Sequence, residues 1–145
     1  MATTLFTIGY EAKTQSEFLA ELTRAGVWTV IDVRAIAASR RPGFAKTALA
    51  GGLRDVGIDY LHLRALGTPK AGREAARQGK TALMREIYAA QLATPEAELA
   101  YEQVRSVARE TPCALLCFER DAKTCHRDVI AERLHAQDGF TIVDI

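Results

Sequence analysis

The amino-acid sequence predicts an α/β domain with three layers, in which a mainly parallel sheet of about five strands carries helices on both faces. Apolar runs of strand length alternate with segments that have the apolar spacing of helices. The runs are apolar along most of their length, as expected for strands covered on both faces. The chain has 145 residues, of which 48% are hydrophobic, and no Pro-rich or Ser/Gly-rich linker divides it. We therefore predict a single domain over residues 1–145.

The strands are predicted from five short apolar runs. The first run ends at Gly9, and the second, from Val27 to Val33, is almost wholly apolar, which is typical of a central strand. Polar segments with turn or helix signals separate all five runs. The predicted strands are residues 5–9, 27–33, 58–63, 113–118 and 141–145.

The helices are predicted from apolar positions three and four residues apart, together with capping signals at their ends. Thr14 and Glu17 form a capping box, and Gly26 ends the first helix as a left-handed cap. Thr94 is an N-cap, followed by Pro95 at the first helical position. The predicted helices are residues 14–26, 45–56, 81–92, 95–110 and 125–137.

Residues 64–80 contain three glycines and a proline, which favours an irregular loop over the site. This segment and residues 33–53 are both rich in cations, and each begins where a strand ends. Because the carboxyl ends of parallel strands meet at one edge, we expect these cations on the same rim of the sheet, where such sheets bind ligands. The rim cations are Arg34, Arg40, Arg41, Lys46, Arg64, Lys70, Arg73, Arg77, Lys80, Lys123, His126 and Arg127.

Composition and charge exclude several classes of protein. A formal net charge of +1 argues against a globally basic nucleic-acid binder. Met1–Leu5 lacks the features of a signal peptide, and no apolar run approaches the roughly 18 residues of a membrane span, so we predict a cytoplasmic protein without membrane contact. Three cysteines are an odd number, which favours reduced thiols over a disulfide framework.

Cys125, His126 and Arg127 are the strongest candidates for chemistry. At the first turn of a helix, free amides and the macrodipole favour an anion or a thiolate. We predict that Cys125 is a nucleophile open to solvent, that His126 or Glu119 moves protons, and that Arg127 holds the anion. The structural alternative is a small residue packed at a helix start beside exposed charges. Ala131 stands where the Cys-x5-Arg loop of thiol phosphatases would need arginine, so that mechanism lacks support.

Four further positions near strand ends are candidates for ligand binding. Asp32 and Arg34 lie on one face of a strand, where they predict a buried pair, although Arg34 at the rim is also a ligand candidate. His62 is either a ligand or a hydrogen-bonded buried histidine. Gly9 and Tyr10 suit close approach of a ligand to the backbone, or an ordinary turn.

A metal site is not indicated by the spacing of cysteines and histidines. Cys117, Cys125, His126 and His62 could converge, but the chain has no Cys-x-x-Cys pair and no His-x-x-x-His pair. Cys117 is expected to pack in the core as a small apolar residue. The sequence therefore predicts no metal ligands and identifies no cofactor.

Six short motifs resemble, in order, the family called domain of unknown function 488. They are Thr7-Ile8-Gly9, Asp32-Val33-Arg34, Ser39-Arg40 with Pro42 and Phe44, Tyr60-Leu61-His62-Leu63 with Leu66-Gly67, Leu115-Leu116-Cys117 with Glu119, and Cys125-His126-Arg127.

The resemblance implies a compact bacterial or archaeal α/β domain whose signature residues gather at one edge of the sheet, without a settled reaction. Tyr10-Glu11 stands where the family usually has His-Ser, and Arg64 where it usually has proline. A mechanism that needs that histidine is therefore not expected here. The site residues that the resemblance implies are Gly9, Arg34, Arg40, Phe44, His62, Cys117, Glu119, Cys125, His126 and Arg127.

Taken together, these patterns predict binding of an anionic phosphate-like or nucleotide-like ligand at the strand-end rim, with Cys125 as a thiolate nucleophile. The alternative is a non-catalytic module in which the same basic loops bind nucleic acid or a nucleotide. A structural or partner-binding role without any ligand is the third hypothesis. Whether the protein is an enzyme is left open by the sequence.

Overall fold

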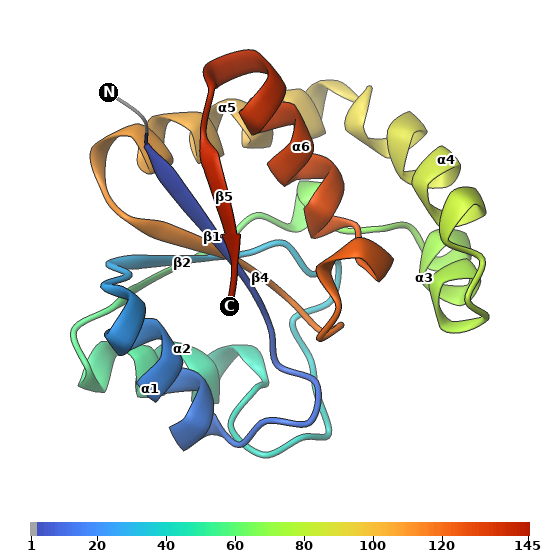
Figure 1. Ribbon diagram of the computed structural model, residues 1–145. Coiled ribbons are helices and arrows are strands. Elements are labelled where there is room, and N and C mark those ends of the chain that lie inside the picture. The colour runs from blue at the N-terminus through green and yellow to red at the C-terminus, as the bar shows by residue number, and fades with distance from the viewer. Residues whose placement is uncertain (1–2) are drawn as a thin grey trace.

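The computed structural model describes residues 3–145, which form one five-stranded sheet in the order β3-β2-β4-β1-β5 with every strand parallel (Figure 1). The prediction of an α/β fold is confirmed. Met1 and Ala2, on which the reading of the amino terminus partly rests, lie outside the described residues. The strands are β1 Thr4–Gly9, β2 Thr29–Asp32, β3 Asp59–His62, β4 Cys113–Cys117 and β5 Thr141–Asp144.

Helices cover both faces of the sheet, as predicted (Figure 1). α1 and α2 pack on one face against an apolar cluster that includes Phe18, Leu49 and Leu116. α3 to α6 pack on the other face, where the cluster includes Tyr88 and Leu115. The helices are α1 Gln15–Ala25, α2 Lys46–Asp55, α3 Lys70–Arg77, α4 Thr81–Leu92, α5 Pro95–Glu110 and α6 Arg127–Asp138.

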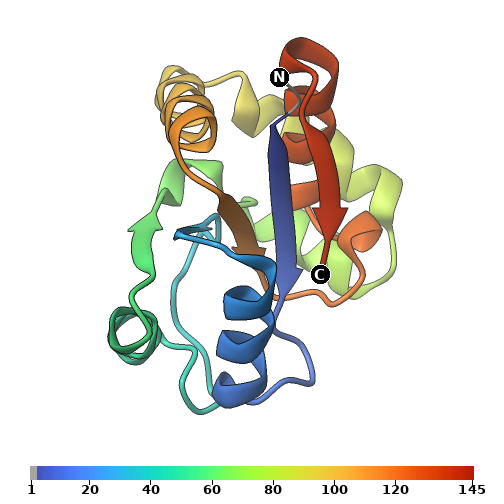
Figure 2. The ribbon, with the colours of Figure 1, turned by 60° about the vertical axis from the view of Figure 1, so that its left-hand side comes forward.

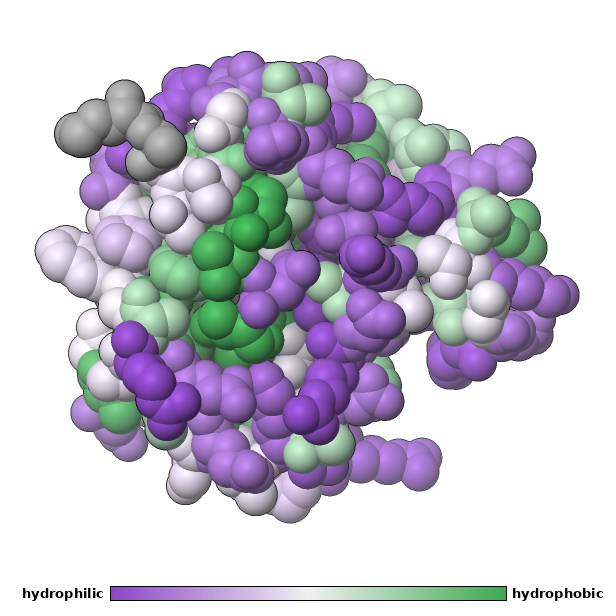
Figure 3. Space-filling view, in the orientation of Figure 1, coloured by the Kyte–Doolittle hydropathy of each residue, from purple (hydrophilic) through white to green (hydrophobic). Residues whose placement is uncertain are grey.

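The central strands β1, β2 and β4 are almost completely buried, whereas β5 forms an exposed edge of the sheet. Figure 2 shows β1 and β5 side by side and pointing the same way. Figure 3 shows apolar surface on the side of the molecule where β5 lies, and Val143 of β5 is partly exposed. Within the described residues, no helix combines the length and the apolar character needed to cross a membrane.

The prediction that residues 64–80 form an irregular loop is wrong. A 3₁₀ turn, η1, covers Arg64–Leu66, and the helix α3 begins at Lys70. Pro69 is compatible with this helix because it occupies the N-cap, where its missing N–H costs nothing. Gly72 lets α3 approach Thr68, since a Cβ atom at this position would lie 2.3 Å from the Thr68 Cγ2 atom. The helix places a regular, positively charged face beside the carboxyl ends of the strands.

Candidate functional site

The carboxyl ends of β1, β2 and β4 meet at one edge of the sheet, and a pocket opens there. Gly9 at the end of β1 pairs with Cys117 at the end of β4, and Asp32 at the end of β2 pairs with Leu116. The pocket, which we call the rim pocket, has a volume of about 400 Å³. Its position is the one at which open α/β sheets bind ligands. Its charged and reactive lining residues are Arg34, Arg73, Arg77, Cys117, Glu119 and His126.

Two cysteines and a histidine meet beside the rim pocket. The Nδ1 atom of His126 lies 3.7 Å from the sulfur of Cys117 and 3.9 Å from the sulfur of Cys125. The three residues, which we call the Cys-His cluster, are all buried, and they offer metal-ligating atoms that lie within 4.8 Å of one another. Cys117 and His126 line the rim pocket and Cys125 does not. Cys117 therefore packs in the core, as predicted, and of the two cysteines it is the one that lines the pocket.

The prediction that the sulfur of Cys125 opens to solvent is wrong, because the residue is 0% exposed. A short 3₁₀ turn, η2, covers Ala122–Thr124, and the N–H of Cys125 donates to the Ala122 carbonyl at 3.0 Å. This turn places Cys125 in the core cluster that α4, α5 and α6 cover. α6 begins at Arg127, two residues later than predicted.

The start of α6 also has fewer free amides than the sequence predicts. The N–H of Asp128 donates to the carbonyl of Cys125 at 3.2 Å, and the N–H of Val129 donates to the carbonyl of His126 at 3.0 Å. These bonds tighten the first turn and use two donors that an anion would need. The positive charge around the rim pocket therefore has to come from side chains.

The charges of the Cys-His cluster depend on one another. Burial alone would raise the pKa of Cys125, but a hydrogen bond from Cys117 and the positive charges of His126 and Arg127 lower it well below its usual value. The hydrogen bond with Cys125, followed by burial, raises the pKa of Cys117 well above its usual value. Burial opposes the protonation of His126, yet the negative charge of Cys125 raises the pKa of that imidazole.

Glu119 and Arg127 lie next to the cluster with unfilled hydrogen-bonding capacity. Arg127 is fully buried, and its Nη1 donates to the Glu119 carbonyl at 2.6 Å. Its Nε and Nη2 atoms, and Oε2 of Glu119, have no partner among the described residues. Burial and the charge of Cys125 raise the pKa of Glu119 to about 7. Glu119 lines the rim pocket, whereas Arg127 does not, so the structure does not bring Arg127 to a ligand in this pocket.

Asp32 and Arg34 form the buried pair that the sequence predicts. The Nη2 atom of Arg34 donates to Oδ2 of Asp32 at 2.7 Å, and its Nε donates to Oδ1 at 2.9 Å. Nη1 donates to the Phe44 carbonyl at 2.8 Å, and the Tyr60 hydroxyl donates to Asp32 at 2.6 Å. Burial opposes the charge of Arg34, but the hydrogen bonds that Arg34 donates to the Asp32 carboxylate keep its pKa above the usual value. Arg34 therefore lines the rim pocket as a largely neutralised cation.

Tyr10 and Phe44 build the support under Arg34. Their rings stack with centroids 4.5 Å apart, and the Arg34 guanidinium lies 5.3 Å from the Tyr10 centroid. Tyr10 lines the rim pocket, whereas Phe44 is fully buried and has no surface for a ligand. Gly9 lies behind the pocket, where its backbone approaches the Glu119 carbonyl closely. Phe44, which the resemblance implies as a site residue, therefore has a supporting position beneath Arg34.

Two further sequence candidates lie outside the rim pocket. Arg40 is exposed in the loop that follows β2. The Nε2 atom of His62 donates a hydrogen bond to the Arg34 carbonyl at 2.8 Å, and the residue lines a separate shallow hollow with Lys46 and Arg64. The rim cations therefore do not all converge, and neither of these two residues joins the Cys-His cluster.

The structure brings to the rim pocket two residues that the sequence named only among the rim cations and not as site candidates. Arg73 and Arg77 from α3 line the rim pocket, together with the apolar side chains of Ile36, Met84 and Phe118. The available signal was the four-residue spacing of the two arginines, which places them on one face if the segment is a helix. That signal was lost because the segment was interpreted as an irregular loop.

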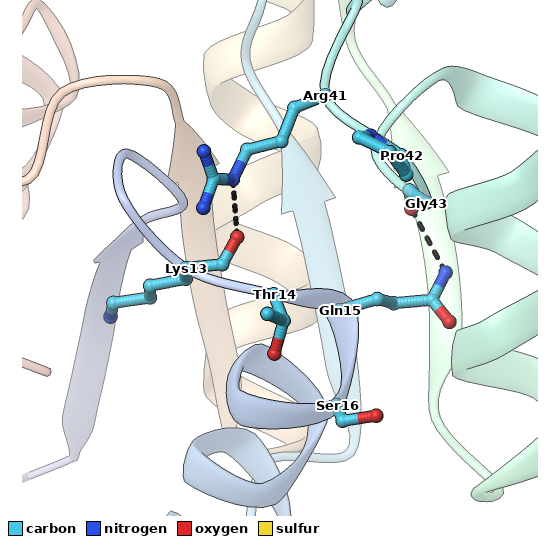
Figure 4. A pocket seen from close by; sticks show the side chains of 7 residues that line it. All are labelled: Lys13, Thr14, Gln15, Ser16, Arg41, Pro42 and Gly43. Atoms are coloured by element: carbon cyan, nitrogen blue, oxygen red, sulfur yellow. Dashed lines mark hydrogen bonds between the residues drawn. The ribbon is translucent and has the colours of Figure 1, made fainter.

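A second hollow of about 500 Å³ lies between the start of α1 and the loop before α2 (Figure 4). Both of its cations are already engaged. Lys13 pairs with Glu21 at 2.5 Å, and the Arg41 side chain donates to the Lys13 carbonyl. Gln15 turns toward the loop and donates to the Gly43 carbonyl at 2.9 Å. This hollow offers less free charge to a ligand than the rim pocket does.

Comparison with known proteins identifies the family. The family model described as Domain of unknown function DUF488 matches residues 14–134. A search of curated proteins and a search of solved structures gave no match. The matched segment extends from the capping box of α1 into α6, and it contains β2, β3, β4 and all residues of the Cys-His cluster. Because this segment is most of the chain, the protein belongs to the family Domain of unknown function DUF488.

Proposed function

We propose that the rim pocket binds a small anionic molecule that also has an apolar or planar part. One observation carries this proposal: two cations of one helix, Arg73 and Arg77, share the pocket lining with apolar side chains. Among those apolar residues, Ile36 is 60% exposed and Phe118 is 44% exposed. A nucleoside monophosphate combines the charge and the planar ring that such a lining suits.

The available positive charge comes mainly from α3. Arg34 lines the same pocket, but Asp32 already neutralises it. Arg73 is anchored through Nη1 to the Thr68 carbonyl at 2.8 Å, and Arg77 is exposed. Guanidinium groups bind phosphate through two parallel hydrogen bonds, so these two side chains are the proposed anion contacts.

The proposed function is binding, without a covalent step. Cys125 lies behind Cys117 and has no exposed surface, so its attack on a ligand in the rim pocket would require the η2 turn to open. The hypothesis that Cys125 acts as a nucleophile is therefore the second candidate, after binding alone. Binding needs no such rearrangement, because the pocket is already open to solvent.

Titration with adenosine monophosphate and with inorganic phosphate tests the proposal. We expect Arg77→Gln and Arg73→Gln each to weaken binding of the nucleotide about tenfold, since one charge-assisted hydrogen bond contributes about 1.5 kcal/mol. Arg120→Gln is the matched control, because Arg120 is an exposed cation that follows β4 without lining the rim pocket. Isothermal titration calorimetry at two salt concentrations measures these changes.

Equal losses in Arg77→Gln and Arg120→Gln would contradict a specific pocket, because they would show that only the general charge of the rim matters. A single-stranded oligonucleotide that binds more tightly than the mononucleotide, with an affinity that falls steeply with salt, would instead support the nucleic-acid module.

A further inference from the structure

We propose that Cys117, Cys125 and His126 bind a zinc ion beside the rim pocket, with the fourth coordination position facing the pocket. The proposal rests on the placement of the three side chains. The metal site does not depend on anion binding, and only the role of its fourth position rests on the proposed function.

The spacing of the donor atoms fits tetrahedral zinc. Zinc binds sulfur at about 2.3 Å and nitrogen at about 2.0 to 2.1 Å, so two such ligands in a tetrahedron lie about 3.6 Å apart. In the protein, Nδ1 of His126 lies 3.7 Å from the sulfur of Cys117 and 3.9 Å from that of Cys125. A small closing movement of the side chains would therefore bring all three atoms to bonding distance of one ion.

The orientation of His126 also fits a ligand role. Its Nε2 lies 2.7 Å from the carbonyl of Val33. A carbonyl only accepts hydrogen bonds, so Nε2 carries the hydrogen, and in the neutral ring Nδ1 is the nitrogen left free for a metal. The sulfur of Cys117 lies at similar distances from the two ring nitrogens, 3.7 Å from Nδ1 and 3.9 Å from Nε2. Metal-bound histidines usually donate their other ring N–H in this way, which fixes the ring. Tyr88 packs edge-on against the imidazole, with the centroids 5.0 Å apart, and restricts it further.

Burial and charge favour an ion that is neutralised by its ligands. The exposed fractions of Cys117, Cys125 and His126 are 5%, 0% and 7%. A divalent ion with two thiolates has no net charge, which suits such a dry site, and binding releases the thiol protons. The fully buried Nε and Nη2 atoms of Arg127 have no hydrogen-bond partner within residues 3–145, and a metal-bound thiolate is a suitable acceptor for them. Soft sulfur ligands select zinc over magnesium or calcium.

The site has three protein ligands, which is typical of zinc sites that keep one position for water or a ligand. Cys117 and His126 line the rim pocket while Cys125 lies behind them, so the fourth position points toward the pocket. Glu119 lines the same pocket, and its Oε2 atom has no partner in the part of the chain that the structure describes. It is placed to accept from a bound water, as the carboxylate beside a zinc-bound water often does.

Metal titration of the full chain tests the site. Reduced protein freed of metal by a chelator is titrated with Co²⁺ and then with Zn²⁺ against a chromophoric chelator. We expect one ion per chain and, with Co²⁺, a thiolate charge-transfer band and tetrahedral visible bands. Cys117→Ala, Cys125→Ala and His126→Ala should each weaken Zn²⁺ binding by more than the roughly 10- to 100-fold that loss of a second-shell group costs.

Cys113→Ala is the matched control, because Cys113 is an equally buried thiol of β4 outside the Cys-His cluster. It should keep both the Co²⁺ spectrum and the affinity for Zn²⁺. A wild-type protein without the thiolate band, or a band that persists in Cys117→Ala, would overturn the proposal. If an alanine variant does not fold, as circular dichroism would show, Cys117→Ser and Cys125→Ser take its place, and their thiolate bands must weaken.

Measurements of phosphate binding distinguish the proposed zinc site from the proposed function of the rim pocket. Inorganic phosphate should bind the zinc-loaded protein more tightly than the metal-free protein. Equal affinity in both forms would overturn the role of the fourth position but not the metal site. Binding of zinc without any binding of phosphate or nucleotide would instead contradict the proposed function alone.

Discussion

Replacing Asp32 by asparagine is expected to lower the free energy of unfolding by about 3 to 5 kcal/mol. Asp32 is fully buried and accepts hydrogen bonds from Arg34 and from the Tyr60 hydroxyl. The substitution removes the negative charge and leaves the buried Arg34 guanidinium, which is only 4% exposed, without its counter-charge. A loss of this size is a large part of the roughly 5 to 15 kcal/mol that stabilises a typical domain. Urea denaturation measures it.

Two variants show whether the uncompensated charge is the cause. Asp59→Asn makes the same chemical change at an exposed position of β3 and should change stability by less than about 0.5 kcal/mol. The double variant Asp32→Asn with Arg34→Met removes both charges, so it should be more stable than Asp32→Asn alone. If Asp32→Asn remains within about 1 kcal/mol of the unmodified protein, the pair contributes far less than the geometry indicates.

Local signals were sufficient to predict most of the fold. The capping box at Thr14 and Glu17 forms as predicted, and Gly26 adopts the left-handed conformation with φ of 77°. Thr94 and Pro95 begin α5 as predicted. Each signal acts over a few residues of the chain, and the apolar runs between them fix which faces are buried. Strand order was not predicted, because it depends on contacts between segments distant in sequence.

The candidate site was harder to predict because its geometry depends on one short turn. The strand pattern places Cys117 at the end of β4, but the η2 turn decides that Cys125, eight positions later, returns to the same point. No metal-ligand spacing such as Cys-x-x-Cys marks this arrangement. Arg73 and Arg77 were expected at the rim, but their common helical face was not predicted, since a proline and three glycines suggested a loop where Pro69 in fact begins a helix.

Replacing Gly9 by alanine is expected to destabilise the protein by about 3 kcal/mol, the upper end of the usual cost of overpacking. A Cβ atom on Gly9 would lie 1.8 Å from the carbonyl oxygen of Glu119 and 2.5 Å from its carbonyl carbon. Both are backbone atoms, so the segment after β4 has to move to relieve the contact. The same carbonyl accepts the hydrogen bond from Arg127, so the movement should also disturb the surroundings of the Cys-His cluster.

Gly51→Ala is the matched control, because Gly51 lies in α2, where a Cβ atom would meet nothing closer than 4.0 Å. Alanine is a better helix former than glycine, so this variant should gain about 0.5 to 1 kcal/mol. The same substitution is thus expected to have opposite signs at the two positions in thermal or urea unfolding. NMR shifts of the Glu119 and Arg127 amides provide the second measurement: they should change in Gly9→Ala and stay fixed in Gly51→Ala. Unchanged shifts and unchanged stability in Gly9→Ala would show that the backbone beside the rim pocket adapts without strain, contrary to the close contact at Glu119.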